Sequence, residues 1–128
     1  MKVLLDTHAL LWSVLSPKSL SRRAALLIGD DNNTILVSAA SAWEIATKVR
    51  LGKLPGAEAL EHDFLDIMDT AGYTLLPIDA AAALRAGRFV SLHRDPFDRV
   101  LAAQALAEDV PIVSTDKQFE AFGVRRIW

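Results

Sequence analysis

The 128-residue sequence contains no cysteine. Disulfide bonds, thiolate metal sites and a cysteine nucleophile are therefore excluded, and the absence fits a reducing compartment. The chain also lacks the run of about 20 apolar residues that a membrane-spanning helix needs. Its opening apolar run is broken by Asp6 and His8, so no signal peptide is expected either. We predict a cytoplasmic protein without a membrane partner.

An excess of positive charge is missing as well. The chain has 14 Lys and Arg against 16 Asp and Glu, for a net charge of −2. A domain that holds nucleic acid through a broad basic face is usually positive. Any contact with nucleic acid must therefore be local, with metal ions supplying part of the positive charge.

Apolar residues, by contrast, are plentiful: they make up 52% of the chain. That is enough for a hydrophobic core, and the length fits a single domain over residues 1–128. Short apolar runs alternate with segments of helical periodicity, which predicts an α/β fold with a mostly parallel sheet covered on both faces. The expected strands are 1–5, 35–37, 73–76, 111–113 and 124–127, and the expected helices are 7–15, 20–28, 38–51, 58–70, 79–87, 97–107 and 117–122.

Four acidic residues lie where such a sheet forms its sites, beyond the carboxyl ends of the strands. Asp6 and Asp116 follow strands, Glu44 comes shortly after the second strand, and Asp98 lies in the first turn after Pro96. Carboxylate oxygens suit hard cations such as Mg²⁺ and Mn²⁺. Clustered carboxylates also repel one another, so without a cation some of them would take up protons.

Helix capping is the competing interpretation of each acid. Asp and Glu are favoured at helix starts by the unpaired N–H groups and the helix dipole. Ser41, three residues before Glu44, matches the capping-box pattern. Asp79 also follows a strand and precedes a helix, and we interpret it as a cap. Taken singly, capping is the better interpretation of every one of these acids.

The segments around the four acids change this balance. Together they resemble the PIN-domain ribonucleases, specifically the VapC-like toxins of bacterial toxin–antitoxin pairs. The resemblance runs from near the first residue to near the last, and its specificity comes from four motifs in a fixed order. In sequence these are DTHALLW at 6–12, SAWEIATK at 41–48, HRDPFDR at 93–99 and VSTD at 113–116.

The resemblance implies a PIN-like three-layer α/β/α fold with a central, mostly parallel sheet of about five strands. Asp6 and the segment 114–116 would then lie on neighbouring central strands. It assigns Asp6, Glu44, Asp98 and Asp116 as catalytic residues and as ligands of Mg²⁺ (or Mn²⁺). The implied activity is endoribonuclease cleavage of tRNA or rRNA by metal-activated water, which leaves a 5′-phosphate and a 3′-hydroxyl.

Neighbouring polar residues are expected to support this site. Thr7, Ser114 and Thr115 either orient the ligands or bind phosphate, or else only hydrogen-bond to nearby backbone. Asp95 precedes Pro96, so it either caps the next helix or touches the metal through water.

His93, Arg94 and Arg99 are interpreted as contacts to RNA phosphate, with a solvated charge cluster as the alternative. Trp12 and Trp43 are expected to pack in the core rather than to stack on bases.

The resemblance also implies partners: an RNA substrate, a cognate antitoxin, and a homodimer or a toxin–antitoxin hetero-oligomer. Family antitoxins lay a segment along a groove near the first helices, and they often place a basic side chain among the carboxylates. We expect exposed apolar positions between Leu10 and Leu27 to form that groove.

Three other functions stay open. A PIN-like fold that only binds its partners is one, and DNA instead of RNA as substrate is another. A receiver-type phosphoacceptor domain has a similar size and acids at strand ends. It would want a second acid beside Asp6 and a central phosphorylated Asp, whereas Asp79 follows Pro77 in the wrong setting.

Overall fold

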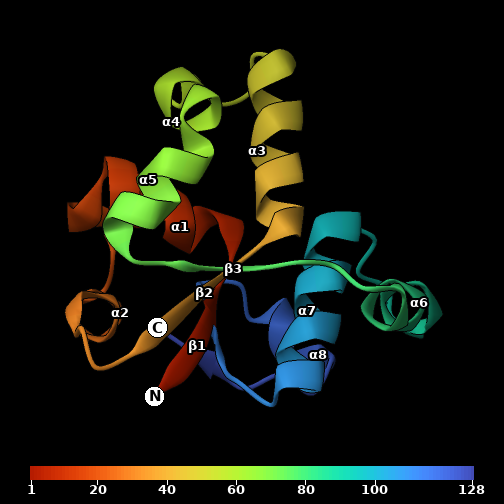
Figure 1. Cartoon of the computed structure of the whole chain (residues 1–128). Helices are drawn as coiled ribbons and strands as arrows, with labels where there is room; N and C mark the ends of the chain where they lie inside the picture. The colour runs from red at the N-terminus through yellow and green to blue at the C-terminus, as the bar shows by residue number, and fades with distance from the viewer.

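The computed structural model describes residues 1–128 and contains one five-stranded sheet with helices on both faces (Figure 1). The strand order is β3-β2-β1-β4-β5, and all neighbouring strands are parallel. The predicted α/β fold is therefore confirmed. The elements in chain order are β1 (Lys2–Leu5), α1 (Thr7–Leu15), η1 (Pro17–Ser19), α2 (Arg22–Gly29), β2 (Thr34–Ser38), α3 (Ala39–Arg50), α4 (Glu58–His62), α5 (Phe64–Ala71), β3 (Thr74–Leu76), α6 (Ala80–Arg88), α7 (Pro96–Glu108), β4 (Ile112–Val113), α8 (Gln118–Ala121) and β5 (Arg126–Ile127).

The three layers follow from the alternation of side chains along β1. Val3 and Leu5 belong to one hydrophobic cluster and Leu4 to the other, because successive strand residues point to opposite faces. The first cluster includes residues of α1, α2, α3, α4 and α5, and the second includes residues of α7 and α8. Both faces of the central strand are therefore covered, as its uninterrupted apolar sequence requires.

The strand order makes β1 the point where the chain changes direction across the sheet. From β1 the chain builds outward through β2 and β3, and it then returns to add β4 and β5 on the other side. Sites in parallel sheets form at such a switch point, beyond the carboxyl ends of the two central strands. Here those strands are β1 and β4.

Several predicted details were wrong. The helix expected over 58–70 is divided at Asp63 into α4 and α5. Leu60, Phe64 and Met68 are all buried, so the apolar pattern continues across the break and gave no sign of it. Trp43 is 56% exposed and packs edge-on against Phe97 instead of entering the core.

None of the helices is long and apolar enough to cross a lipid bilayer.

Candidate active site

The first two acids of the site follow the neighbouring strands β1 and β4. Asp6 comes directly after β1, and its backbone N–H donates to the carbonyl of Val113 on β4 at 3.1 Å. The Ser114 hydroxyl donates to Asp6 Oδ2 and accepts a hydrogen bond from the backbone N–H of Asp116 at 2.9 Å. A single buried hydroxyl therefore joins the two acid-bearing segments, which lie on adjacent central strands as predicted.

Asp6 is both a helix cap and a member of the site. Its Oδ1 accepts a hydrogen bond from the backbone N–H of Ala9 at 2.7 Å, so it caps α1. Its side chain is also buried, and burial raises the pKa of this carboxyl although the bonds from Ser114 and Ala9 oppose the rise. The two interpretations of this acid are thus compatible.

Glu44 is positioned from α3. The Thr7 hydroxyl donates to Glu44 Oε1 at 2.6 Å, and Lys48 Nζ donates to Oε2 at 2.5 Å. The capping-box interpretation of Ser41 and Glu44 is wrong, because α3 begins three residues earlier with Ser38 as its cap. Ser41 lies inside the helix, 3.0 Å from the Thr7 hydroxyl.

Asp98 contributes the fourth carboxylate, from the first turn of α7. Its Oδ2 lies 2.9 Å from His93 Nε2. Burial raises the pKa of Asp98 to about 6; the charges of Asp95 and Glu44 add to the rise, and the hydrogen bond to His93 opposes it. Asp95 caps α7 by accepting from the backbone N–H groups of Phe97 and Asp98, so the capping interpretation of Asp95 is confirmed.

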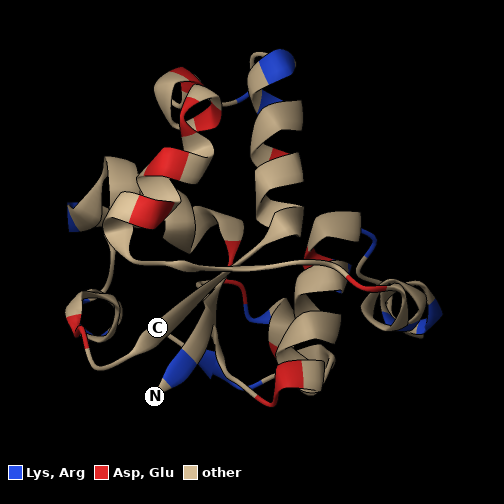
Figure 2. Cartoon of the chain, in the orientation of Figure 1, with Lys and Arg blue, Asp and Glu red and all other residues tan.

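Ligand atoms of His93, Asp98 and Asp116 all lie within 4.8 Å of one another. Asp6 is linked to this group through Ser114, and the charge of Glu44 raises the pKa of both Asp6 and Asp98. Figure 2 shows acidic segments of several elements near the carboxyl ends of the central strands. The donors are carboxylate oxygens with one imidazole nitrogen, a set that fits Mg²⁺ or Mn²⁺.

Arg99 is bound to the backbone of a neighbouring segment. Its guanidinium donates to the backbone carbonyls of Ala86, Phe89 and His93 at 2.9, 2.6 and 2.9 Å. These hydrogen bonds join Arg99 to the end of α6 and to the loop before α7, and its contact to RNA phosphate stays a prediction. Arg94 and Thr115 are exposed.

The family model of the PIN domain matches residues 3–124, nearly the whole length of the chain. The chain belongs to the PIN domain family. Among curated proteins it is similar to "Ribonuclease VapC16" of Mycobacterium tuberculosis, with 47% identity over 55 residues. That match covers 43% of this chain and spans only 39% of the length of the relative.

Solved structures with the same fold cover almost the whole PIN domain. VapBC2 from Rickettsia felis, bound to a DNA fragment from its promoter, has a TM-score of 0.70 at 19% identity, covering 99% of this chain and 98% of that one. FitAcB from Neisseria gonorrhoeae has a TM-score of 0.68 at 18% identity, with coverage of 98% and 96%. VapBC-1 from nontypeable Haemophilus influenzae has a TM-score of 0.65 at 14% identity, with coverage of 99% and 97%. At these identities the likeness shows the fold alone.

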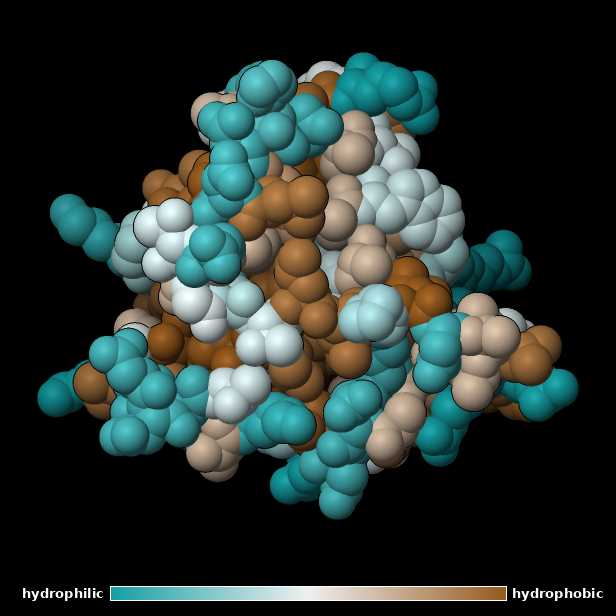
Figure 3. Space-filling view, viewed as in Figure 1, coloured by the Kyte–Doolittle hydropathy of each residue, from teal (hydrophilic) through white to brown (hydrophobic).

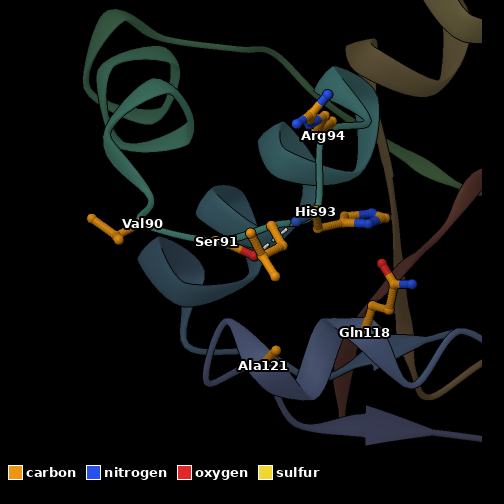
Figure 4. Close-up of a pocket in the computed structure, with 7 residues that line it drawn as sticks. Val90, Ser91, His93, Arg94, Gln118 and Ala121 are labelled. Atoms are coloured by element: carbon orange, nitrogen blue, oxygen red, sulfur yellow. Dashed lines mark hydrogen bonds between the residues drawn. The ribbon is translucent and has the colours of Figure 1, made fainter.

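A hollow of about 680 Å³ adjoins the acidic site of this PIN domain. His93 belongs to both the hollow and the group of ligand atoms. In Figure 4, the side chains of His93 and Gln118 extend into the same space from the loop before α7 and from α8. The residues that line the hollow are Val90, Ser91, Leu92, His93, Arg94, Gln118 and Ala121.

Lys48 is a site residue that sequence reasoning missed. Partial burial lowers its pKa, but the bond to Glu44 and the charges of Glu44, Asp95 and Asp98 raise it above its usual value. Lys48 therefore places a fixed positive charge among the acids of the PIN domain. In the sequence, Lys four residues after Glu is the spacing of an ordinary surface ion pair on a helix, so the pattern gave no signal.

Proposed function

We propose that this PIN domain is a metal-dependent endoribonuclease that acts as the toxin of a toxin–antitoxin pair. The main support is the group of His93, Asp98 and Asp116, whose ligand atoms lie within 4.8 Å of one another and to which Ser114 joins Asp6. Burial raises the pKa of both Asp6 and Asp98. Negative charge concentrated in a half-buried place favours a bound cation. The similarity to "Ribonuclease VapC16" also supports the proposed ribonuclease activity.

Asp6, Glu44, Asp98 and Asp116 are the proposed ligands of Mg²⁺ or Mn²⁺. Thr7 and Lys48 each hold one oxygen of Glu44, and Ser114 holds Asp6, so the carboxylates are oriented by the protein itself. A divalent ion bound there would neutralise the charge of the phosphodiester and lower the pKa of a water molecule. Cleavage at this site would leave a 5′-phosphate and a 3′-hydroxyl.

The proposed substrate is single-stranded or looped RNA, because its backbone and bases are accessible. An RNA strand bound at the acids can extend into the hollow beside His93. The exposed Arg94, which lines this hollow, is suited to bind one of its phosphates. We propose tRNA or rRNA as the natural target class.

The activity is tested by incubating the purified chain with total RNA and Mn²⁺, with and without a chelator. We expect Asp98→Asn and Asp116→Asn to lower the cleavage rate by about 100-fold or more, since each removes a proposed ligand. Asp79→Asn is the matched control, because Asp79 also follows a strand and caps a helix yet lies elsewhere. It should cleave at the wild-type rate.

Equal cleavage by all of these proteins would identify a contaminating nuclease. If the chain binds RNA but does not cleave it with any of the metal ions tested, the result would support an inactive binding module instead. Competition with single-stranded DNA of the same sequence tests the choice of RNA as substrate.

We also propose that a cognate antitoxin occupies the face formed by α1 and α5. The solved structures with this fold include VapBC2 and VapBC-1. Of the apolar residues between Leu10 and Leu27, Leu15 and Leu26 are 47% and 67% exposed, whereas Leu10 and Leu11 are buried. A hollow of about 520 Å³ lies nearby, lined by Ser13, Val14, Asp63, Asp66, Ile67, Thr70, Ala71 and Tyr73.

A homodimer is proposed over the exposed edge of the sheet. β3 is an edge strand, and Leu75 on it is 41% exposed. Figure 3 shows hydrophobic residues gathered in a band on the face that β3 crosses in Figure 1. An unpaired edge beside exposed apolar side chains is a surface that a second copy can cover.

A further inference from the structure

We propose that His93 binds the divalent ion directly through Nε2, beside Asp98 and Asp116, and that this nitrogen makes the site prefer Mn²⁺ over Mg²⁺. The inference deepens the proposed function and rests on it in one respect, namely that a divalent ion binds at the carboxylates.

The first argument is the spacing of the donor atoms. His93 Nε2 and Asp98 Oδ2 are 2.9 Å apart. Two adjacent ligands at about 2.1 Å from an octahedral ion are themselves about 3 Å apart. The pair is therefore already spaced as neighbouring ligands, and a cation can take the place of the hydrogen that now joins them. The nearest ligand atom of Asp116 lies within 4.8 Å of both, within reach of the same ion after a small movement.

The second argument is that the imidazole is held in place from several sides. The His93 carbonyl accepts from Arg99, its backbone N–H donates to Ser91 Oγ at 3.1 Å, and its ring packs edge-on against Phe122 at 5.8 Å between centroids. The His93 side chain is 17% exposed. The adjacent Leu92 is 97% exposed, so this loop turns the histidine inward and leaves its neighbour in solvent.

The third argument is the chemistry of the donors. Imidazole nitrogen suits transition-metal ions, whereas Mg²⁺ prefers oxygen and water ligands. A site of carboxylates alone gives a smaller advantage to Mn²⁺. If His93 served only to hold Asp98 by a hydrogen bond, its loss would weaken both ions alike. The two roles therefore predict different selectivities.

The test uses the full chain with Mn²⁺ alone and no RNA. Pulsed electron paramagnetic resonance should detect coupling of the bound Mn²⁺ to a histidine nitrogen. We expect His93→Gln to lose this coupling, and His8→Gln and His62→Gln to keep it; these are the only other histidines in the chain. We also expect His93→Gln to weaken Mn²⁺ binding by about tenfold or more, and Mg²⁺ binding by about twofold or less.

Selective ¹⁵N labelling of histidine in the wild-type protein gives a second test that does not depend on the folding of a variant, since the coupling should change from that of ¹⁴N to that of ¹⁵N. Bound Mn²⁺ without nitrogen coupling, or a parallel loss of Mn²⁺ and Mg²⁺ affinity in His93→Gln, overturns the role of His93 but leaves the nuclease proposal standing. Failure of the wild-type chain to bind Mn²⁺ at all overturns both.

Discussion

Asp6 and Asp79 have the same local setting, since each follows a strand and caps the next helix through its side chain. Their surroundings differ. Asp6 follows the central strand β1, is 6% exposed and accepts the Ser114 hydroxyl, whereas Asp79 follows the edge strand β3 and is exposed. The position of the strand in the sheet, and not the local pattern, therefore makes one acid part of the site and the other only a cap.

The burial of Asp98 makes the free energy of unfolding depend on pH. Its pKa is raised by burial to about 6 in the folded chain, from 3.8 for an ordinary Asp. Between these values the folded state binds more protons than the unfolded state, so the free energy of unfolding falls as the pH rises from about 4 to about 6. In chelator, we expect Asp98→Asn to flatten this fall by on the order of 1 kcal/mol, a figure discounted for the partial exposure of the carboxyl.

Urea unfolding at pH 4 and pH 7 measures this difference. Asp79→Asn, with the same chemical change at a capping position, should keep the wild-type dependence. An Asp98→Asn variant whose stability still falls with pH as the wild type does would show that Asp98 is not the group responsible.

At the scale of elements, Arg99 of α7 contacts the end of α6 and the loop between the two helices. A planar guanidinium donates in several directions at once, and here it reaches the carbonyl of Ala86 in α6 and those of Phe89 and His93 in the loop before α7. A lysine ammonium at the same place has no such fork. Arg99 is therefore one of the contacts that hold this loop and, through the His93 carbonyl, the position of His93 beside Asp98.

We expect Arg99→Lys to speed amide hydrogen exchange in residues 87–93 by about tenfold, which corresponds to about 1.4 kcal/mol of lost local stability. Exchange in β1 and β4 should change little, because those strands lie in the core. Arg94→Lys is the matched control, since Arg94 is exposed in the same loop. Unchanged exchange in Arg99→Lys would mean that the carbonyl contacts do not hold this loop.

The elements themselves were largely predictable. Periodicity and breaker residues gave the five strands and most helices within a few residues, because these signals act over a few positions in the chain. The start of α3 was predicted to within one residue, since the helix expected from residue 38 begins at Ala39 after its cap Ser38. The break at Asp63 was not predictable in the same way, because the buried apolar positions Leu60, Phe64 and Met68 continue across it.

At the scale of the whole molecule, the hollow between α1 and α5 joins segments that are far apart in the sequence. Ser13 and Val14 line one side, and Asp66 and Ile67 the other. The mixture of apolar and acidic side chains suits an amphipathic antitoxin segment that carries a basic residue. This surface is separate from the acids at the ends of β1 and β4.

We expect Asp66→Lys to weaken binding of the antitoxin encoded beside this chain by about tenfold, since reversing a charge at an interface introduces repulsion. Asp69→Lys makes the same change on α5 at an exposed position outside the hollow, and it should bind normally. Affinity is measured by titration calorimetry. Equal binding by both variants would place the antitoxin on another face.

The succession of strands and helices along the chain, the apolar core, and the four acids with their family resemblance all follow from the sequence, because short patterns encode each of them. Which acids share a site, and what surrounds them, follows from the packed fold. The bond from Ser114 to Asp6 joins residues 108 positions apart, and that from Thr7 to Glu44 joins residues 37 apart. Such contacts are set by the order of strands in the sheet, which brings distant segments together at one edge, and no short stretch of the chain contains that order.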